Sequence, residues 1–218
     1  MGNLRGLIVF DLDGTLVDSR RDLADAANAL ILDRGGTPLT EQAIGRMVGD
    51  GAAMLVRRAL AAAAVPLDDS SLPRFLDLYD ARLLRTTRAY PGMAEALGAL
   101  THHGPLAVLT NKPLGHTRKL LDALDLASYF ASVVGGDGPF ARKPDPASLQ
   151  HLMTTHQAAP RRTVLVGDSH IDAATARAAG AVFCLARYGF GAEGAALDAD
   201  RAVEAPAGLP AAIEELLR

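Results

Sequence analysis

The sequence predicts an α/β fold, a doubly wound, Rossmann-like parallel sheet with an inserted cap of α-helices. Short apolar runs that end in glycine or polar residues are typical of strands buried on both faces, and helical patterns separate these runs. Strand alternating with helix implies parallel βαβ units with right-handed crossovers. The alternation is broken once, because no good strand candidate lies between about Val17 and Thr87.

The predicted strands are the segments where apolar residues cluster. They are residues 7–10, 106–109, 133–134, 164–166 and 181–185, with a short last strand near Ala202 and Val203. Helices are predicted at about 94–102, 115–124, 147–156 and 172–179, and a C-terminal helix at about 209–217. Residues 189–208 are rich in Ala and Gly and are otherwise predicted as a loop.

The long segment after the first strand is predicted to be a small helical domain. Apolar residues recur at helical spacing near both of its ends, at Leu23, Ala27, Leu30 and Ile31 and again at Phe75, Leu76, Tyr79 and Leu83. The segment far exceeds the roughly dozen residues that a βαβ crossover needs. We therefore predict a core domain of residues 1–16 and 88–218 and a cap domain of residues 17–87. The alternative is that these helices simply cover the sheet.

Composition and charge restrict the function classes. The chain has 218 residues, and 22 basic against 25 acidic residues give a net charge of −3, which favours neither a nucleic acid nor a membrane as partner. A single cysteine excludes an intramolecular disulfide and a Cys cluster for zinc. The first apolar run meets Asp11 after only four residues, which fits neither a signal peptide nor a membrane span. We expect a cytoplasmic protein, monomeric or homodimeric.

Two carboxylates follow the first predicted strand. Side chains alternate along a strand, so Asp11 and Asp13 can point the same way at its carboxyl end, where doubly wound sheets bind ligands. Two such carboxylates repel each other unless a cation or a shared proton compensates. The alternative for this segment is a common Asp-Gly turn at Asp13 and Gly14.

Polar residues also follow the second predicted strand and precede a later helix. Thr110 and Asn111 offer a hydroxyl and an amide suited to an oxyanion, although a helix cap before Pro113 is an equally good interpretation. Lys143 lies beside Pro144 on a restrained loop, where its ammonium can neutralise a phosphate or a carboxylate. The alternative for this lysine is a solvated surface side chain.

A further acidic pair follows the fourth predicted strand. Asp168 comes at the end of that strand and Asp172 near the start of a helix, where acidic residues are also favoured by the helix dipole. Taken with the residues above, these carboxylates form one face of hard oxygen ligands without His or Cys, which suits Mg²⁺. A magnesium site with a free carboxylate, a lysine and oxyanion donors is typical of phosphoryl transfer.

The sequence resembles the haloacid dehalogenase superfamily. Four segments match the motifs of that superfamily in order, namely DLDGTLVDS at 11–19, TNK at 110–112, KPDP at 143–146 and GDSHID at 167–172. Within it, GRMVGDGAAMLVRRAL at 45–60, YPG at 90–92 and TNKP at 110–113 look most like the phosphoglycolate phosphatases. The resemblance implies a Mg²⁺-dependent phosphatase that hydrolyses a small phosphomonoester, 2-phosphoglycolate, through an aspartyl-phosphate.

The resemblance also implies roles for individual residues. Asp11 is expected to be the nucleophile, and Asp13 the general acid toward the leaving alkoxide and then the base for the hydrolytic water. Thr110 and Asn111 are expected to hold phosphate oxygens. Lys143 is expected to offset the charge on the nucleophile and on the phosphoryl group.

The metal site implied by the same resemblance uses both ends of the acidic face. Mg²⁺ is expected to bind the Asp11 side chain, the Asp13 backbone carbonyl and Asp168, with Asp172 orienting these ligands.

Other chemistries stay open, namely a β-phosphoglucomutase-like or pyrophosphatase-like enzyme of the superfamily and a non-catalytic phosphoester- or protein-binding homologue. Dehalogenation is disfavoured by Asp13, because a halide needs no acid. A Schiff base on a cap lysine is excluded, because no lysine precedes Lys112.

Overall fold

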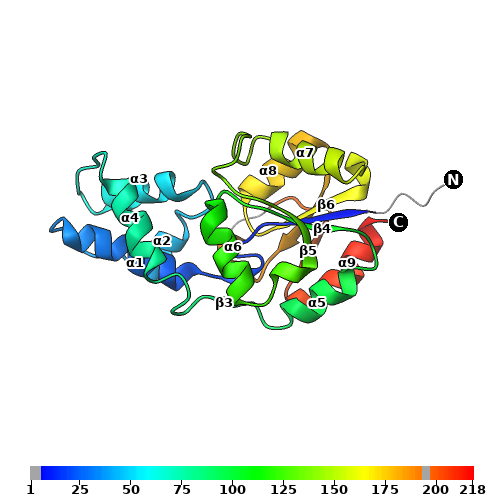
Figure 1. Ribbon diagram of the computed structural model, residues 1–218, viewed down its shortest axis with the longest axis horizontal. Coiled ribbons are helices and arrows are strands. Elements are labelled where there is room, and N and C mark those ends of the chain that lie inside the picture. Colours follow the sequence, from blue (N-terminus) through cyan, green and yellow to red (C-terminus); the bar gives the residue numbers. More distant parts are fainter. Residues whose placement is uncertain (1–5, 193–196) are drawn as a thin grey trace.

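The computed structural model describes residues 6–192 and 197–218 of the chain. A parallel sheet covered by helices forms one end of the molecule, and four helices that follow the first strand gather at the other end (Figure 1). The predicted fold class, a parallel α/β sheet with an inserted helical segment, is confirmed. None of the helices within the described residues is long and apolar enough to cross a membrane.

The central sheet is entirely parallel. Its strands are β1 (Leu7–Phe10), β4 (Leu106–Leu109), β5 (Phe130–Val134), β6 (Thr163–Gly167), β7 (Val182–Ala186) and β8 (Arg201–Val203). They lie in the order β5-β4-β1-β6-β7-β8, so β1 occupies the middle of the sheet. Because β1 is enclosed on both sides by β4 and β6, its carboxyl end opens onto the centre of the sheet edge where ligands bind.

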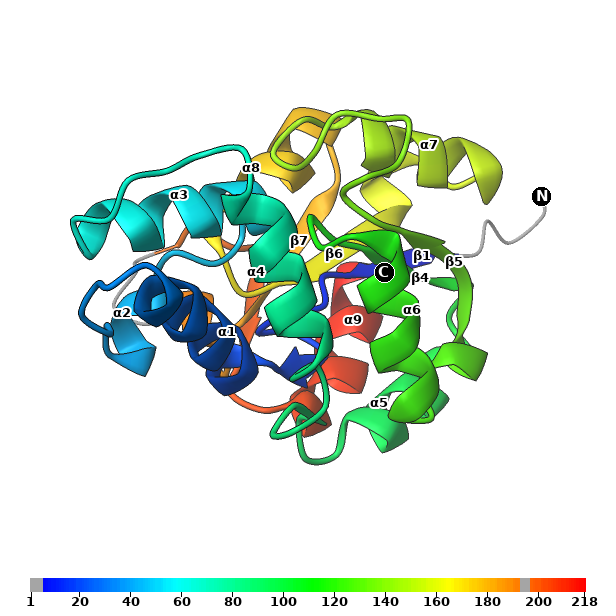
Figure 2. The ribbon, with the colours of Figure 1, turned by 60° about the vertical axis from the view of Figure 1, so that its left-hand side comes forward.

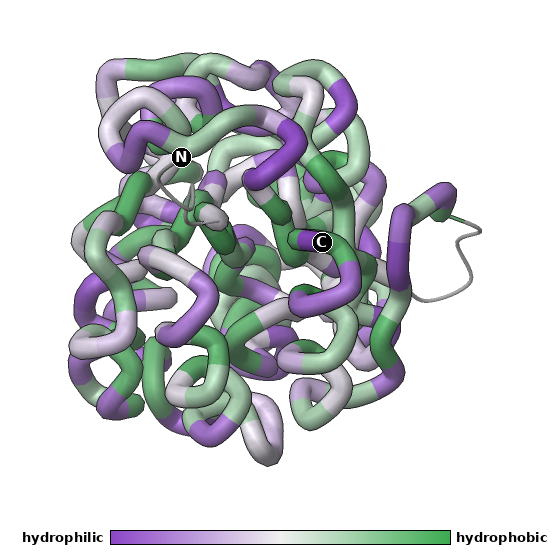
Figure 3. Tube along the Cα trace, turned by 90° about the vertical axis from the view of Figure 1, so that its right-hand side faces the viewer, coloured by the Kyte–Doolittle hydropathy of each residue, from purple (hydrophilic) through white to green (hydrophobic). Residues whose placement is uncertain are grey.

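Both faces of the sheet are covered by helices. Leu7 and Val9 of β1 face one apolar cluster, and Ile8 and Phe10 face the other, as the alternation of a strand requires. The covering helices are α5 (Met93–Leu100), α6 (Leu114–Ala123), α7 (Ala147–Thr155), α8 (His170–Ala179) and α9 (Leu209–Leu216). Hydrophobic and hydrophilic stretches alternate along the chain, as amphipathic helices around a buried sheet demand (Figure 3).

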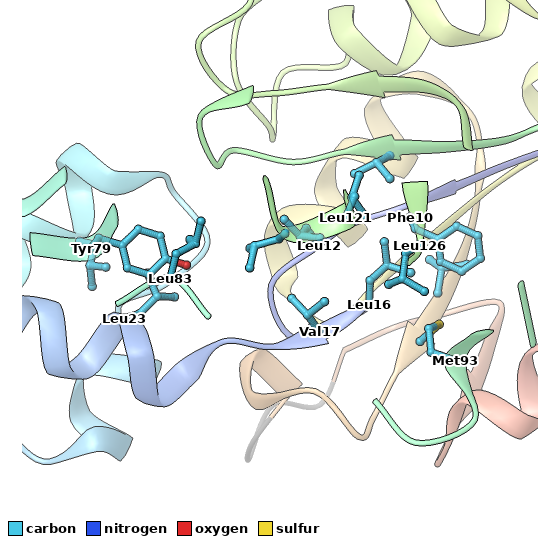
Figure 4. Close-up of a cluster of buried hydrophobic side chains, with 14 of the residues drawn as sticks. Phe10, Leu12, Leu16, Val17, Leu23, Tyr79, Leu83, Met93, Leu121 and Leu126 are labelled. Carbon is cyan, nitrogen blue, oxygen red and sulfur yellow. The ribbon is translucent and has the colours of Figure 1, made fainter. Parts of the chain in front are cut away.

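The inserted helices are α1 (Arg20–Asp33), α2 (Glu41–Gly45), α3 (Ala52–Ala62) and α4 (Ser71–Asp80). They pack on one another beside the sheet (Figures 1 and 2). Their interior includes Leu23, Tyr79 and Leu83, which lie apart from the core side chains near Phe10 (Figure 4). We call residues 17–87 the cap segment; the boundaries of the two domains stay a prediction.

Two short strands connect the cap segment to the core. β2 (Val17–Asp18) pairs antiparallel with β3 (Arg88–Ala89), so the two chain crossings lie side by side. The expectation that no strand lies between about Val17 and Thr87 fails at β2, because a two-residue strand is too short to produce a hydrophobic period. Single turns of 3₁₀-helix complete the fold at η1 (Ala127–Tyr129), η2 (Pro160–Arg162), η3 (Phe190–Ala192) and η4 (Pro206–Gly208).

A buried carboxylate in α1 binds the chain just before β3, where it leaves the cap segment. Asp22 of α1 is fully buried and accepts hydrogen bonds from the backbone N–H and the hydroxyl of Thr87, at 2.8 and 2.7 Å. The hydroxyl of Thr86 donates to the same carboxylate at 2.6 Å. Burial alone would raise the pKa of Asp22, but these hydrogen bonds outweigh burial and hold the pKa below its usual value. The carboxylate is therefore ionised and holds helix α1 against Thr86 and Thr87, where the chain returns to the core.

Candidate active site

The carboxyl end of β1 carries the first two predicted site residues. Asp11 continues the strand, because its N–H donates to the carbonyl of Val166 at 2.9 Å. The chain then turns sharply at Gly14, whose positive φ of 85° lies in the left-handed region that glycine adopts without strain. The turn is closed by the Gly14 N–H donating to the carbonyl of Val17 at 2.9 Å. Asp11 and Asp13 thus both line the same pocket.

Lys143 lies between two of the carboxylates. Its Nζ is 2.8 Å from Asp11 Oδ1 and 2.6 Å from Asp172 Oδ1, and the residue is only 5% exposed. Burial alone would lower the pKa of Lys143, but the two carboxylates outweigh burial and raise it. The side chain is therefore an ammonium that offsets negative charge beside Asp11, and the alternative of a solvated surface lysine is excluded.

The second acidic pair follows β6. Asp168 is almost fully buried, and its Oδ2 accepts a hydrogen bond from the Gly191 N–H at 2.8 Å. Asp172 forms a capping box at the start of α8, where its Oδ2 accepts from the N–H and the hydroxyl of Ser169 at 3.1 and 2.6 Å. Asp172 therefore has a local structural role in addition to its contact with Lys143.

The acidic residues converge closely enough to hold one metal ion. One carboxylate oxygen each of Asp11, Asp168 and Asp172 lies within 4.8 Å of the others. Burial and the neighbouring carboxylates raise the pKa of Asp168 well above its usual value. Burial likewise raises the pKa of Asp11 to about 6, although Lys143 opposes the shift. A bound cation would favour the ionised form of such a buried cluster.

The donor set and its charge fit a divalent cation. Carboxylate oxygens are hard ligands of the kind that Mg²⁺ and similar ions prefer. Glycines leave the Asp168 carboxylate room, since a Cβ at Gly14 or at Gly189 would collide with it. The four aspartates of the site outnumber its two buried lysines, so a cation would offset their negative charge.

A second buried lysine, Lys112, was missed by the sequence analysis. Its Nζ lies 2.8 Å from both carboxylate oxygens of Asp13, and the Ser19 hydroxyl donates to Asp13 Oδ1 at 2.5 Å. The ammonium also lies 4.7 Å from the centre of the Tyr79 ring in the cap segment. The TNK segment places this residue directly after the second predicted strand, where its neighbours Thr110 and Asn111 were singled out. Its partners, however, are 99 and 33 positions away and become visible only in the fold.

Thr110 and Asn111 lie where they were predicted, at the end of β4 and in the pocket wall. The Thr110 hydroxyl accepts a hydrogen bond from the Lys112 N–H at 3.2 Å. The Asn111 amide donates to the carbonyls of Gly49 and Lys143, at 2.8 and 2.9 Å. Asn111 thus joins the cap segment to the core loop that holds Lys143. That both residues hold phosphate oxygens stays a prediction.

The pocket lies between the cap segment and the strand ends. Its lining includes Asp11, Asp13 and Asn111 from the core and Leu23, Leu55 and Phe75 from the cap. The cavity volume is about 50 Å³, room for only a few water-sized molecules. A site of this size, with buried ionic groups on one wall and apolar side chains on the other, suits a small charged molecule.

Comparisons with known proteins point to one family. A model for haloacid dehalogenase-like hydrolases matches residues 8–186 of this chain. The phosphoglycolate phosphatase of Rhodospirillum rubrum is 44% identical over 195 residues, which cover 85% of this chain and 81% of that protein. The phosphoglycolate phosphatase of Pseudomonas putida is 38% identical over 206 residues, covering 91% of this chain and 75% of that protein.

A solved structure agrees with these relatives. The crystal structure of a predicted phosphoglycolate phosphatase from Haemophilus somnus superimposes with a TM-score of 0.86. Its sequence is 29% identical, and the superposition covers 96% of this chain and 98% of that chain. The similarity therefore extends over the sheet and over the inserted helices as well.

Proposed function

This chain belongs to the haloacid dehalogenase-like hydrolases, and on that premise we propose that it is a Mg²⁺-dependent phosphatase that hydrolyses 2-phosphoglycolate through an aspartyl-phosphate. The observation that carries the proposal is the Asp11 carboxylate, held 2.8 Å from the Lys143 ammonium beside two further aspartates in the pocket between the cap segment and the strand ends. Relatives at 38–44% identity are named phosphoglycolate phosphatase, which supports the reaction class and the substrate.

Asp11 is the proposed nucleophile. One of its oxygens attacks phosphorus and forms the aspartyl-phosphate as the bond from phosphorus to the leaving oxygen breaks. The Lys143 ammonium contacts both Asp11 and Asp172, so the nucleophile is oriented before substrate arrives. The ammonium also offsets the negative charge that an incoming phosphate adds.

Asp13 is the proposed acid and base. It gives a proton to the leaving oxygen of the ester in the first step and takes one from the attacking water in the second step. The Lys112 ammonium and the Ser19 hydroxyl fix its position at the pocket wall. Thr110 and Asn111 are proposed to lie against the phosphoryl oxygens from the neighbouring strand end.

Asp11, Asp168 and the backbone carbonyl of Asp13 are the proposed ligands of the cation. Asp172 keeps these ligands in place through its contacts with Lys143 and Ser169. When bound, a divalent cation neutralises charge on the phosphoryl oxygens and on the nucleophile. The small cavity supports a small phosphorylated metabolite as the substrate, in place of a phosphoprotein.

The test is phosphate release with and without Mg²⁺ from 2-phosphoglycolate, pyrophosphate and β-glucose 1-phosphate. We expect the highest kcat/KM for 2-phosphoglycolate and no release after chelation of the metal. Faster hydrolysis of pyrophosphate, or conversion of the sugar phosphate without phosphate release, would replace the proposed substrate by one of the alternative family reactions. No turnover of any of the three would favour a non-catalytic binding protein.

A further inference from the structure

One wall of the pocket carries polar groups that the proposed mechanism leaves unused. Tyr79 of α4 is 2% exposed, and its hydroxyl has no hydrogen-bond partner among the residues that the structure describes. Nδ1 of His116 in α6 is also buried and, within the same described ranges, unpartnered. A buried polar group without a partner is costly, so two together in one pocket wall need an explanation.

These two groups lie beside the Lys112 ammonium. The rings of Tyr79 and His116 have centroids 5.5 Å apart, and Lys112 Nζ lies 4.7 Å from the Tyr79 ring centre. All three residues line the pocket that contains Asp11 and Asp13. The Tyr79 hydroxyl points from the cap segment toward the core (Figure 4). The groups therefore form one compact cluster, contributed by the cap and by the core together.

The cluster lies on the side of the pocket where the leaving group must be. Asp13 is the proposed proton donor to the leaving oxygen, and Lys112 contacts Asp13 directly. Whatever is attached to that oxygen therefore extends toward Lys112 and Tyr79. The neighbouring wall is apolar, with Leu23, Leu55 and Phe75 among its residues, so a polar substituent finds its partners in this cluster.

The chemistry of the cluster selects an anion. Lys112 is an ammonium with three N–H groups, of which Asp13 takes two. Burial raises the pKa of Tyr79 to about 12, so its hydroxyl is a neutral donor. His116 Nε2 lies 3.5 Å from Asp80 Oδ1, so Nδ1 becomes a second donor when the ring carries both protons, a state that a bound anion beside it favours. A fixed positive charge flanked by donors matches a carboxylate, whereas a cationic substituent would be repelled.

We propose that Lys112, Tyr79 and His116 form a subsite for a carboxylate on the leaving group, so that the enzyme selects small phosphoesters whose alcohol bears an adjacent acid. This inference rests on the proposed function and assigns its specificity to named residues. An enzyme with such a subsite distinguishes 2-phosphoglycolate from ethyl phosphate, which has a methyl group where the carboxylate would be. The difference arises because the unsatisfied donors are paired only by the acid.

The experiment compares kcat/KM for 2-phosphoglycolate with kcat/KM for ethyl phosphate in the wild-type enzyme and in Tyr79→Phe. The variant keeps the ring and removes only the hydroxyl. We expect the ratio of the two constants to fall by about tenfold or more, the size of effect typical of one hydrogen bond to a charged group. Tyr129→Phe, which removes a hydroxyl from a tyrosine outside the pocket lining, is the matched control and should leave the ratio unchanged.

Lys112→Met provides a second, independent variant. Loss of the contact with Asp13 should slow both esters, but loss of the charge should slow 2-phosphoglycolate more, so the ratio again falls. Competitive inhibition by phosphonoacetate relative to ethylphosphonate should weaken in parallel. An unchanged ratio in both variants would overturn the subsite while leaving the phosphatase intact. A wild-type enzyme that hydrolyses neither ester would instead overturn the proposed function, and the subsite with it.

Discussion

The Lys112 ammonium lies 2.8 Å from both carboxylate oxygens of Asp13, a residue 99 positions earlier in the chain. The pair is buried at the boundary between the cap segment and the core, with side-chain exposures of 4% and 11%. Removing one partner from such a pair leaves an uncompensated charge in a region of low polarity. The pair therefore couples the position of the proposed acid to the chain that follows β4.

A double-mutant cycle of Lys112→Met and Asp13→Asn measures this coupling. We expect an interaction free energy of about 1–3 kcal/mol in urea unfolding, because the two groups are in direct contact and largely desolvated. The matched control is the exposed pair of Arg177 and Asp198, whose closest atoms are 2.5 Å apart. Its cycle with Arg177→Met and Asp198→Asn should give about 0–1 kcal/mol. Equal values for the two cycles would contradict the prediction.

Asp11→Asn tests the nucleophile. The amide cannot form an acyl phosphate, so kcat for phosphate release should fall by about 10³-fold or more. The fold should persist, because Lys143 retains Asp172 as a partner 2.6 Å away. Far-UV circular dichroism checks the fold, and Asp122→Asn on the exposed side of α6 is the control for activity. Full activity in Asp11→Asn would remove this residue from its proposed role.

Gly189→Ala tests the space around the Asp168 carboxylate. An added Cβ would collide with that carboxylate and with the Gly14 carbonyl, so Asp168 must shift. We expect the Mg²⁺ concentration for half-maximal activity to rise by about 10–100-fold, the range seen when groups that support metal ligands are altered. Gly115→Ala is the control, because its added Cβ meets nothing within 4 Å. The same metal requirement in both variants would show that Asp168 does not hold the ion.

Asp22→Asn tests the connection at the exit of the cap segment. At pH 7 the variant should lose about 1–3 kcal/mol of unfolding free energy, because the amide cannot accept all the hydrogen bonds that Thr86 and Thr87 donate. The exposed Asp25→Asn on the same helix is the control.

The pH dependence of this difference has a defined sign. The pKa of Asp22 is lower in the folded state than its usual 3.8, so its stabilisation is fully present above pH 3.8. It is lost as the pH falls through the folded-state pKa. The gap between wild type and Asp22→Asn should therefore be constant from pH 7 to about 5 and shrink in more acidic solution. A gap that grows toward acid would contradict the assignment.

Buried parallel strands were the most predictable part of the fold. Residues 7–10 and 106–109 are each fully buried strands, and a continuous apolar run is the pattern that such burial requires. The edge strand β5 begins at Phe130, earlier than the predicted 133, and the half-buried Ser132 interrupts its apolar run before Val133. The apolar pattern therefore predicts the full extent of the enclosed strands β1 and β4, whereas the extent it predicts for the edge strand β5 is too short.

The candidate site was predictable to the extent that chain order places residues at strand ends. Asp11, Asp168 and Lys143 converge because each follows a segment that ends at the same edge of the sheet. The contacts from Lys112 to Asp13 and to Tyr79 depend on how the cap segment settles on the core, and this docking leaves no periodic pattern in the sequence. The polar wall opposite the nucleophile was therefore found only in three dimensions.

The two hydrogen bonds of the Asn111 amide connect the cap segment with the core loop that holds Lys143. One bond reaches the Gly49 carbonyl in the cap segment, and the other reaches the carbonyl of Lys143. The same amide therefore spans the boundary between the cap segment and the loop that holds the Lys143 ammonium 2.8 Å from Asp11. A displacement of Gly49 away from the core would break the first bond and act directly on the group that holds the second.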